Sequence, residues 1–252
     1  MAGGSLGLAP PPTTQKDCAR ISAMKRLVLF DIDETMIYSD GVGRRAMEAA
    51  LRQVFDQNVD ATGLSMSGKT DPQICYELLT SMGYSMDEIK EKLPFAFKLY
   101  LELLEKEIEN SGRIKLHSGV VELLQELEKH PECHLGLLTG NIEEGARLKL
   151  RPFDLNRNFV FGAFGSDSAN RNDLPLFAHK RANEVLGKEF SREEIVIIGD
   201  AVNDVLCAKG YGVKCIITAT GKTPKETLAQ LNPDYLFDSL CDTPRVMQAI
   251  LS

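Results

Sequence analysis

The sequence predicts an α/β fold in which a parallel sheet carries helices on both faces and a smaller helical unit is inserted into the chain. Two observations support this prediction. From residue 27 onward, short apolar runs alternate with stretches of helical periodicity, a pattern typical of a parallel sheet. The first two apolar runs are separated by roughly a hundred residues, whereas a crossover between parallel strands needs only about a dozen or more. A folded unit is therefore expected between them.

Six short apolar runs are predicted to form the strands of this sheet. Each is bounded by turn or helix patterns and is too short for an ordinary helix. The predicted strands occupy residues 27–31, 135–139, 159–163, 195–199, 213–217 and 235–237.

The segment between the first two strands has the periodicity of helices. Its second helix is predicted to be capped by Asp71, ahead of a proline in the first turn, and to end near Gly83. Ser85 and Glu88 have the spacing of a capping box, which would start a third, long helix reaching about residue 109. Pro94 is expected to break or kink that helix. The first helix has one apolar face, formed by Ala46, Met47, Ala50, Leu51, Val54 and Phe55.

These patterns divide the chain into three parts. Residues 1–24 are a Gly/Pro/Ala/Thr-rich tail that is expected to be flexible, residues 25–38 and 115–252 form the α/β core, and residues 39–114 form the inserted helical unit. The tail has no secretory pattern, and a cytoplasmic location is predicted. Its low acidity leaves organellar import as a weaker alternative.

The composition is that of a soluble enzyme of ordinary size. The formal net charge of -7 over 252 residues gives no basic surface for nucleic acid, and no run approaches the ~18 apolar residues of a membrane span. Six cysteines without paired spacing are interpreted as reduced. Four dispersed histidines are too few for a histidine-based metal site, so any metal is expected to have oxygen ligands. The sequence leaves monomer or homodimer open.

The most informative segment is the first apolar run, because it ends in two carboxylates, Asp31 and Asp33. Strand ends are where α/β enzymes place their chemistry, and alternation along an extended chain points both side chains in the same general direction. One could attack a phosphorus atom while the other handles a proton, and two such charges need a cation. The run at 195–199 leads in the same way into Asp200 and Asp204.

A further apolar run, 135–138, leads into Thr139, Gly140 and Asn141. Each motif alone is commonly a turn, a cap or a solvated loop. The ordered set resembles the haloacid dehalogenase superfamily, whose pattern is D-x-D-x-T, a strand-terminal Ser or Thr, a basic residue and G-D-x-x-x-D. The helical insertion is similar to the cap of its phosphoglycolate phosphatase and β-phosphoglucomutase branch. The resemblance covers about residues 26 to 240 and implies a Rossmann-like three-layer core with an inserted helical cap.

The resemblance also implies a role for each carboxylate. Asp31 would be the nucleophile that forms an aspartyl-phosphate, and Asp33 the general acid and base. A magnesium ion, Mg²⁺, would be held by Asp31, by the backbone carbonyl of Asp33 and by Asp200, with Asp204 supporting the cluster. Dehalogenase members have a tyrosine in place of the second aspartate, so Asp33 argues for phosphoryl transfer.

The phosphate would be bound by Thr139, by the N–H groups of Gly140 and Asn141 at a helix start, and by a basic residue. Relatives usually have a Lys-Pro pair before a helix that ends in Leu-Gly, and this chain departs from that pattern. Arg171 precedes the helix predicted to begin near residue 174, whereas Lys180 lies about two turns inside it. Arg171 is favoured, because it lies nearer the catalytic edge, and Lys180 is the alternative. A guanidinium can bridge phosphate and carboxylate, although it is not a neutral replacement for lysine.

Lys69, Thr70 and Asp71 belong to a loop similar to the cap loop that faces substrate in this branch, which makes them candidate substrate contacts. The other reading is a helix cap beside a solvated charge. The predicted function is a magnesium-dependent phosphatase of small phosphate monoesters, with 2-phosphoglycolate as the leading candidate. The alternatives are a β-phosphoglucomutase-like phosphoryl transferase and a non-catalytic binding or scaffold member. The expected partner is a small phosphorylated metabolite.

Overall fold

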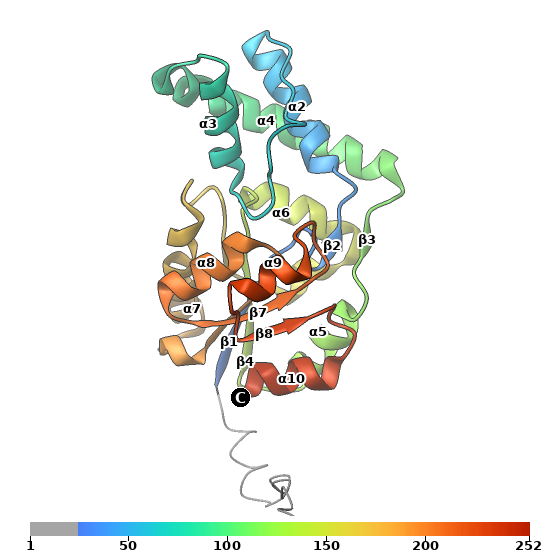
Figure 1. The fold of residues 1–252 in the computed structure, drawn as a ribbon, viewed down its shortest axis with the longest axis vertical. Coiled ribbons are helices and arrows are strands. Elements are labelled where there is room, and N and C mark those ends of the chain that lie inside the picture. The colour runs from blue at the N-terminus through green and yellow to red at the C-terminus, as the bar shows by residue number, and fades with distance from the viewer. Residues whose placement is uncertain (1–24) are drawn as a thin grey trace, which may run out of the picture.

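The computed structural model describes residues 25–252, and the predicted flexible tail of residues 1–24 lies outside the described residues. Its centre is a six-stranded sheet with the order β5-β4-β1-β6-β7-β8, in which all neighbouring strands are parallel (Figure 1). The predicted parallel sheet is thereby confirmed. The strands are β1 (Arg26–Phe30), β4 (Cys133–Leu138), β5 (Gly162–Ala163), β6 (Ile195–Gly199), β7 (Lys214–Thr218) and β8 (Tyr235–Phe237).

Five of the six predicted strands agree with the structure to within two residues at each end. The strand predicted at 159–163 is wrong over most of its length, because only Gly162–Ala163 pair with β4. The preceding residues form a 3-10 turn, η2 (Leu155–Asn158). Phe159 and Phe161 are buried in separate hydrophobic cores, which accounts for the apolar pattern. At this edge of the sheet the apolar run marks burial rather than strand pairing.

The helices of the core cover both faces of the sheet, as predicted. Along β1, Val28 and Phe30 belong to one buried core, and Leu27 and Leu29 belong to the other, as the alternation of an extended strand requires. Burial on both faces explains why this run is continuously apolar. The first core includes residues of α5 (Val120–Glu128), α6 (Glu143–Leu150) and α10 (Thr243–Leu251), and the second includes residues of α7 (Leu174–Leu186), α8 (Val202–Tyr211) and α9 (Lys225–Gln230).

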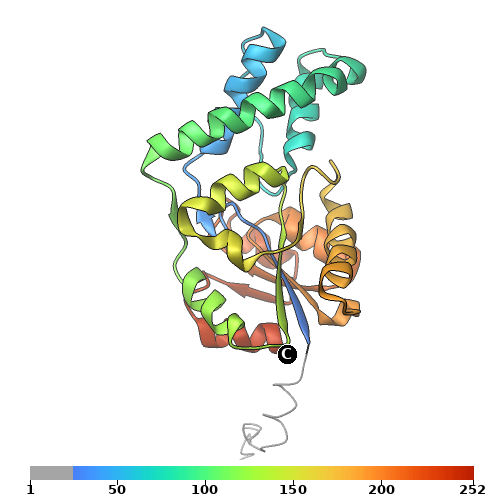
Figure 2. The ribbon, with the colours of Figure 1, turned by 180° about the vertical axis from the view of Figure 1, so that it is seen from behind.

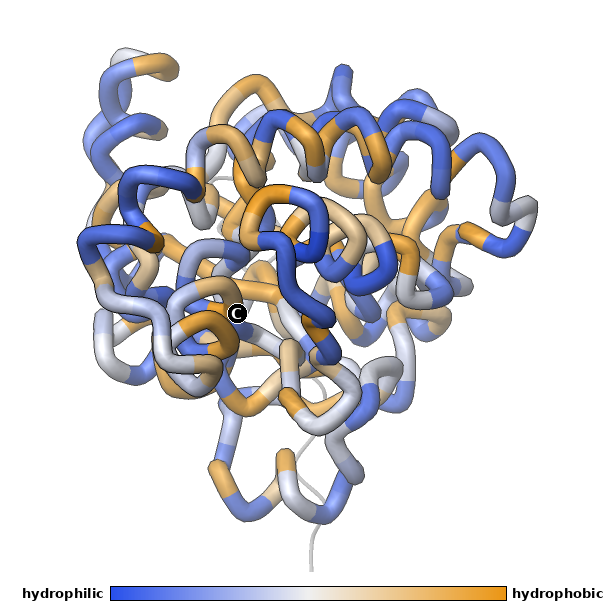
Figure 3. The backbone as a smooth tube through the Cα atoms, turned by 90° about the horizontal axis from the view of Figure 1, so that it is seen from above, coloured by the Kyte–Doolittle hydropathy of each residue, from blue (hydrophilic) through white to orange (hydrophobic). Residues whose placement is uncertain are grey.

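Residues 39–114, here called the helical insert, form a layer above the carboxyl ends of the strands (Figure 1). The insert contains α2 (Val42–Phe55), α3 (Asp71–Ser81) and α4 (Met86–Ser111). The apolar face predicted for α2 packs into a core shared with α3 and α4, and only Val54 of that face is partly exposed. Hydrophobic and hydrophilic stretches alternate along the helices seen from above, as expected of amphipathic helices (Figure 3).

The long helix α4 begins with the predicted capping box of Ser85 and Glu88. It runs without interruption through Pro94 to Ser111, so the expected break is wrong (Figure 2). Leu93 and Ala96, on either side of the proline, are buried in the core of the insert. This packing holds the helix together across the backbone hydrogen bond that a proline cannot donate.

The start of α3 differs from the prediction by one residue. Thr70 is the cap, since its side chain accepts a hydrogen bond from the backbone N–H of Gln73, and Asp71 is the first residue of the helix. A threonine oxygen can replace the aspartate oxygen at a cap, which leaves the Asp71 carboxylate for another partner. Gly83 follows the end of α3 with a positive φ of 92°, consistent with its predicted place at the helix end.

A short antiparallel ribbon joins the core to the helical insert. Its strands, β2 (Ile37–Tyr38) and β3 (Lys115–Leu116), lie at the two points where the chain enters and leaves the insert. The sequence did not predict this ribbon, because two-residue strands are too short for a period to be seen. Across residues 25–252, no helix is both long and apolar enough to cross a membrane. The remaining turns are η1 (Arg151–Phe153), η3 (Arg171–Asp173) and η4 (Arg192–Glu194).

Candidate active site

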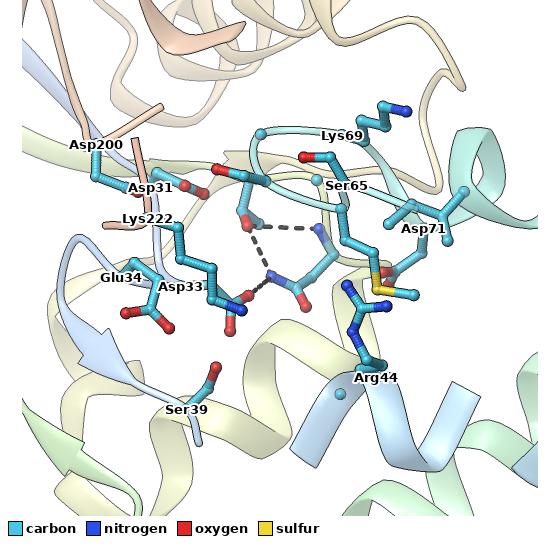
Figure 4. A pocket seen from close by; sticks show the side chains of 18 of the residues that line it. Asp31, Asp33, Glu34, Ser39, Arg44, Ser65, Lys69, Asp71, Asp200 and Lys222 are labelled. Carbon is cyan, nitrogen blue, oxygen red and sulfur yellow. Dashed lines mark hydrogen bonds between the residues drawn. The ribbon is translucent and has the colours of Figure 1, made fainter. Parts of the chain in front are cut away.

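Three sequence motifs meet at neighbouring strand ends. Asp31 follows β1, Thr139 follows β4 and Asp200 follows β6, and β1 lies between the other two strands in the sheet. Parallel strands end at the same edge, so these side chains converge there. All three residues are buried, and Asp31 and Asp200 lie beside each other in Figure 4.

Asp31, Asp200 and Asp204 form a buried acidic cluster, in which one carboxylate oxygen of each lies within 4.8 Å of the others. Burial raises the pKa of Asp31 to about 6, against the lowering effect of the Arg171 guanidinium. Burial, followed by the charges of Asp204 and Asp31, also raises the pKa of Asp200. Thr35 donates a hydrogen bond of 2.9 Å to Asp200 Oδ1. Burial and the neighbouring carboxylates therefore both disfavour the anionic forms of this cluster, and a nearby positive charge would favour them.

Asp204 supports the cluster from within. Its Oδ2 accepts hydrogen bonds from the backbone N–H groups of Asp200 (3.1 Å) and Ala201 (2.9 Å). Its Oδ1 accepts a hydrogen bond from Arg171, whose guanidinium also lies 3.4 Å from Asp31 Oδ1. With both oxygens engaged, Asp204 fixes the strand end that carries Asp200 and the guanidinium that faces Asp31.

A second buried group surrounds Asp33, and one of its members, Lys149, was not predicted from the sequence. Lys149, on α6, donates hydrogen bonds from Nζ to both carboxylate oxygens of Asp33, at 2.8 and 2.7 Å, and to Asn141 Oδ1 at 2.6 Å. Asn141 Nδ2 donates to Asp33 Oδ2 (2.7 Å) and to Thr139 Oγ1 (2.9 Å), as the dashed lines of Figure 4 show. Burial alone would raise the pKa of Asp33, but the charge of Lys149 and hydrogen bonds from Lys149, Asn141 and Ser39 hold it below its usual value.

The residues present suit a hard divalent cation. Around the strand ends, four carboxylates (Asp31, Asp33, Asp200 and Asp204) face two cations (Lys149 and Arg171), which leaves two negative charges without a partner among these six groups. Mg²⁺ carries two positive charges and prefers oxygen ligands. Asp33 is paired with Lys149, whereas burial and mutual repulsion raise the pKa values of Asp31 and Asp200, so a bound cation would act mainly on the acidic cluster.

A cavity of about 430 Å³ lies between the strand ends and the helical insert. The motif residues form its floor, and Arg44, Ser65 and Lys69 of the insert contribute to its walls. Lys222, from the loop after β7, enters from the core side near Glu34 and Asp33 (Figure 4). Carboxylates and cations therefore line one compartment, large enough for a small metabolite.

The loop before α3 closes this cavity by docking on the core. The backbone N–H of Asp71 donates to the carbonyl of Gly140 at 2.7 Å, and Thr70 Oγ1 donates to the carbonyl of Ala169 at 2.7 Å. A Cβ atom at Gly140 would lie 2.0 Å from the carbonyl oxygen of Lys69, so only glycine permits this approach. Gly140 is therefore needed for packing against the loop before α3, in addition to its place in the motif that follows β4.

The three candidate substrate contacts of this loop have different surroundings. Lys69 pairs with Glu77 of α3, and its side chain points away from the carboxylates in Figure 4. Thr70 is fully buried as the cap of α3. The Asp71 carboxylate lines the cavity and accepts a hydrogen bond of 2.9 Å from the N–H of Ile142, at the start of α6. Burial raises the pKa of Asp71 to about 6, opposed by the nearby charge of Lys149.

The two candidates for the basic residue of the phosphate site, Arg171 and Lys180, also have different surroundings. Arg171 begins η3, just before α7, and is 4% exposed beside Asp31 and Asp204. Lys180 lies inside α7 and is exposed to solvent, and it does not line the cavity. The predicted start of this helix at Leu174 is confirmed.

The chain is similar in sequence to a phosphoglycolate phosphatase and a pyrophosphatase, and similar in fold to a crystal structure. The chain is 25% identical over 228 residues to phosphoglycolate phosphatase of Photorhabdus laumondii subsp. laumondii, covering 86% of this chain and 90% of that protein. It is 27% identical over 131 residues to pyrophosphatase PpaX of Halalkalibacterium halodurans, covering 51% and 58% respectively. The crystal structure of CbbY from Rhodobacter sphaeroides in complex with phosphate aligns with a TM-score of 0.66 at 18% identity, over 87% of this chain and 96% of that one.

The match to a family covers most of the chain. Residues 28–218 fit the sequence model of the haloacid dehalogenase-like hydrolases, a span that runs from within β1 to the end of β7 and includes the helical insert. That span carries each of the strand-end motifs described above. The chain therefore belongs to the haloacid dehalogenase-like hydrolase family.

Proposed function

We propose that this protein is a Mg²⁺-dependent phosphatase of small phosphate monoesters that works through an aspartyl-phosphate at Asp31. The observation that carries the proposal is the buried acidic cluster at the strand ends, with a guanidinium on one side and a separately held carboxylate, Asp33, on the other. Phosphoryl transfer requires a nucleophile, a proton carrier and charge neutralisation at one place. Asp31 would provide the nucleophile, Asp33 the proton carrier, and Arg171 part of the charge neutralisation.

In the first step, Asp31 attacks phosphorus and the bond between phosphorus and the ester oxygen breaks. Asp33 gives a proton to the leaving oxygen, which departs as an alcohol. Because Lys149 and its neighbours hold the pKa of Asp33 below its usual value in the free protein, the negative charge of the bound phosphate would have to raise that pKa for Asp33 to carry the proton. Arg171, 3.4 Å from Asp31 Oδ1, faces the negative charge that the transferring group carries. Thr139 and the N–H groups that follow it form the other side of the phosphate site.

In the second step, a water molecule attacks phosphorus, the bond to Asp31 breaks, and inorganic phosphate is released. Asp33, now a carboxylate, accepts the proton of that water. Mg²⁺ would be held by Asp31, Asp200 and the backbone carbonyl of Asp33, and when bound it neutralises the charge that otherwise keeps an anionic nucleophile from a phosphate.

The helical insert would act as a cap that closes the cavity and restricts the size of the substrate. A cavity of about 430 Å³ suits a small metabolite better than a polymer. The name of the relative from Photorhabdus laumondii supports 2-phosphoglycolate as the leading candidate. Asp71 and the cations of the cavity wall would contact the part of the substrate beyond the phosphate.

A substrate panel tests this proposal. Purified protein is incubated with Mg²⁺ and 2-phosphoglycolate, pyrophosphate, sugar phosphates of three to six carbons or 4-nitrophenyl phosphate, and released inorganic phosphate is measured. We expect Mg²⁺-dependent release from at least one monoester, abolished by chelator. Conversion of a sugar 1-phosphate to its 6-phosphate without net release would instead identify a mutase, and absence of both reactions across the panel would support a non-catalytic protein.

A further inference from the structure

The buried lysine of α6 has a place in the site that the strand-end motifs do not explain. Lys149 is 4% exposed, although burying an unpaired ammonium is strongly unfavourable. Its three N–H donors are matched by three acceptor atoms, Asp33 Oδ1, Asp33 Oδ2 and Asn141 Oδ1, at 2.8, 2.7 and 2.6 Å. No donor of this ammonium is left for a substrate. The contact set is that of a group that holds other side chains.

The side chains that Lys149 holds form a closed ring. Lys149 binds both Asp33 and Asn141, and Asn141 Nδ2 donates to Asp33 Oδ2 at 2.7 Å, which closes the ring. Asn141 Nδ2 also donates to Thr139 Oγ1 at 2.9 Å. These contacts fix which end of the Asn141 amide points toward Asp33, because its oxygen faces an ammonium. The ring therefore ties the carboxylate of β1 to the phosphate-site residues after β4.

The helical insert covers this ring from above. A Cβ atom at Gly43, in the first turn of α2, would lie 3.2 Å from Lys149 Nζ, so the chain of the insert passes close over the ammonium. The Lys149 side chain is 5% exposed, whereas that of Asp33 is 31% exposed. Both residues line the cavity, but Asp33 is much the more exposed of the two.

We propose that Lys149 is a positioning residue that sets the carboxylate of Asp33 against the leaving oxygen of the substrate. This inference rests on the proposed function, because it assigns a role to Lys149, the hydrogen-bond partner of the proposed general acid and base, Asp33. A general acid is effective only within hydrogen-bond reach of the atom that it protonates, and small misplacements are costly. Asp33 without Lys149 keeps its hydrogen bonds from Asn141 and Ser39 and loses the contact that engages both of its oxygens.

The dependence of rate on the leaving group tests the proposal. Ester oxygens that leave easily need little proton transfer, whereas alkoxides need a well-placed acid. We measure kcat/KM, which reports the first phosphoryl transfer, for 4-nitrophenyl phosphate, phenyl phosphate and the best alkyl phosphate of the substrate panel. The variants are Lys149→Met and Lys149→Arg, with Lys180→Met as the same substitution at an exposed lysine of α7.

Lys149→Met should lose kcat/KM by ~10²-fold or more for the alkyl phosphate and by about tenfold less for 4-nitrophenyl phosphate, in the range of general acid catalysis. Lys149→Arg should recover part of this selective loss, and Lys180→Met should match the parent protein. The ratio between substrates is measured within one preparation, so an inactive or unfolded fraction cancels from it. Equal losses for all leaving groups, or unchanged activity in Lys149→Met, would overturn the positioning role. Absence of turnover by the parent protein would instead refute the proposed function.

Discussion

The guanidinium of Arg171 lies 3.4 Å from the carboxylate of Asp31 and also donates a hydrogen bond to Asp204. One cation thus joins the end of β1 to the start of α8. Burial opposes any isolated charge here, and the charges of Asp204 and Asp31 raise the pKa of Arg171. A residue held in this way has a preset direction before any phosphate arrives.

Arg171→Ala should therefore reduce kcat/KM by ~10²-fold or more, the typical loss of one preorganised donor. Lys180→Ala should leave it unchanged, because that side chain is exposed on α7. Removing Arg171 also leaves buried carboxylates without a partner, so thermal unfolding is recorded for both variants, and Arg171→Lys is included to retain the charge. A large loss for Lys180→Ala beside a mild one for Arg171→Ala would show that Lys180, and not Arg171, is the basic residue of the phosphate site.

Asp31→Asn should lower kcat by ~10³-fold or more, because an amide is a poor nucleophile and lacks the charge that holds the metal. No covalent phosphoryl group should be trapped on this variant after acid quenching during turnover, whereas the parent protein should show one. The matched control is Asp167→Asn, an aspartate that pairs with Arg181 outside the cavity. Full activity of Asp31→Asn would refute its role as the nucleophile.

Asp33→Asn should separate catalysis from metal binding. The variant keeps the backbone carbonyl assigned to Mg²⁺ but cannot move a proton, so turnover should fall while Mg²⁺ affinity changes little. The structure supports this division, because the Asp33 carboxylate bonds with Lys149 and Asn141 and stands apart from the acidic cluster. Calorimetric titration of Mg²⁺ and kinetics on the same sample check it, and equal loss of both properties would show that the acid and base has been misassigned.

The sequence predicts the sheet well because its central strands are buried on both faces and read as continuous apolar runs. The failure at 159–163 lies at the edge, where β5 has only two paired residues and burial occurs without a regular strand. The strand-end carboxylates are predictable for the same reason. A polar residue that directly follows a buried apolar run must lie at the carboxyl edge of the sheet.

Lys149 escaped prediction because its role depends on tertiary contacts. A lysine in the second turn of a helix is ordinarily solvated, and nothing adjacent in sequence marks this one as buried. The sequence contains one weak sign that Lys149 is buried near the site: it follows Asn141 by eight residues and lies between Leu148 and Leu150. The docking of Asp71 on α6 was equally hidden, because it joins the insert to a helix of the core that begins more than 70 residues later.

Gly140→Ala should weaken the closed arrangement of the helical insert. The added methyl group would meet the carbonyl oxygen of Lys69 at 2.0 Å, and neither backbone can yield without moving the loop before α3. Displacement of that loop by about 1 Å should lower kcat/KM by up to ~10²-fold. Gly210→Ala is the control, because a Cβ atom there meets no atom within 4 Å. Activity of Gly140→Ala equal to that of the control would show that the loop does not need this contact.

The affinity for Mg²⁺ should fall steeply as the pH drops below about 6, the pKa to which burial raises Asp31 in the metal-free protein. A raised carboxylate pKa favours the protonated form, so protons compete with the metal below that value, and the competition disappears above it. For one displaced proton, the dissociation constant rises about tenfold for each pH unit below the pKa, and the raised pKa of Asp200 makes the dependence steeper.

The same titration distinguishes the contribution of Arg171, because its charge lowers the pKa of Asp31. Without that charge, protons should hold the Asp31 carboxylate up to a higher pH. Calorimetric titration of Mg²⁺ between pH 5 and about 8 should therefore show a higher midpoint for Arg171→Ala than for the parent protein, since removal of a cation moves a carboxylate pKa upward. Arg171→Lys, which retains the charge, should shift the midpoint less. An Mg²⁺ affinity independent of pH across this range would show that Asp31 is not a ligand of the metal.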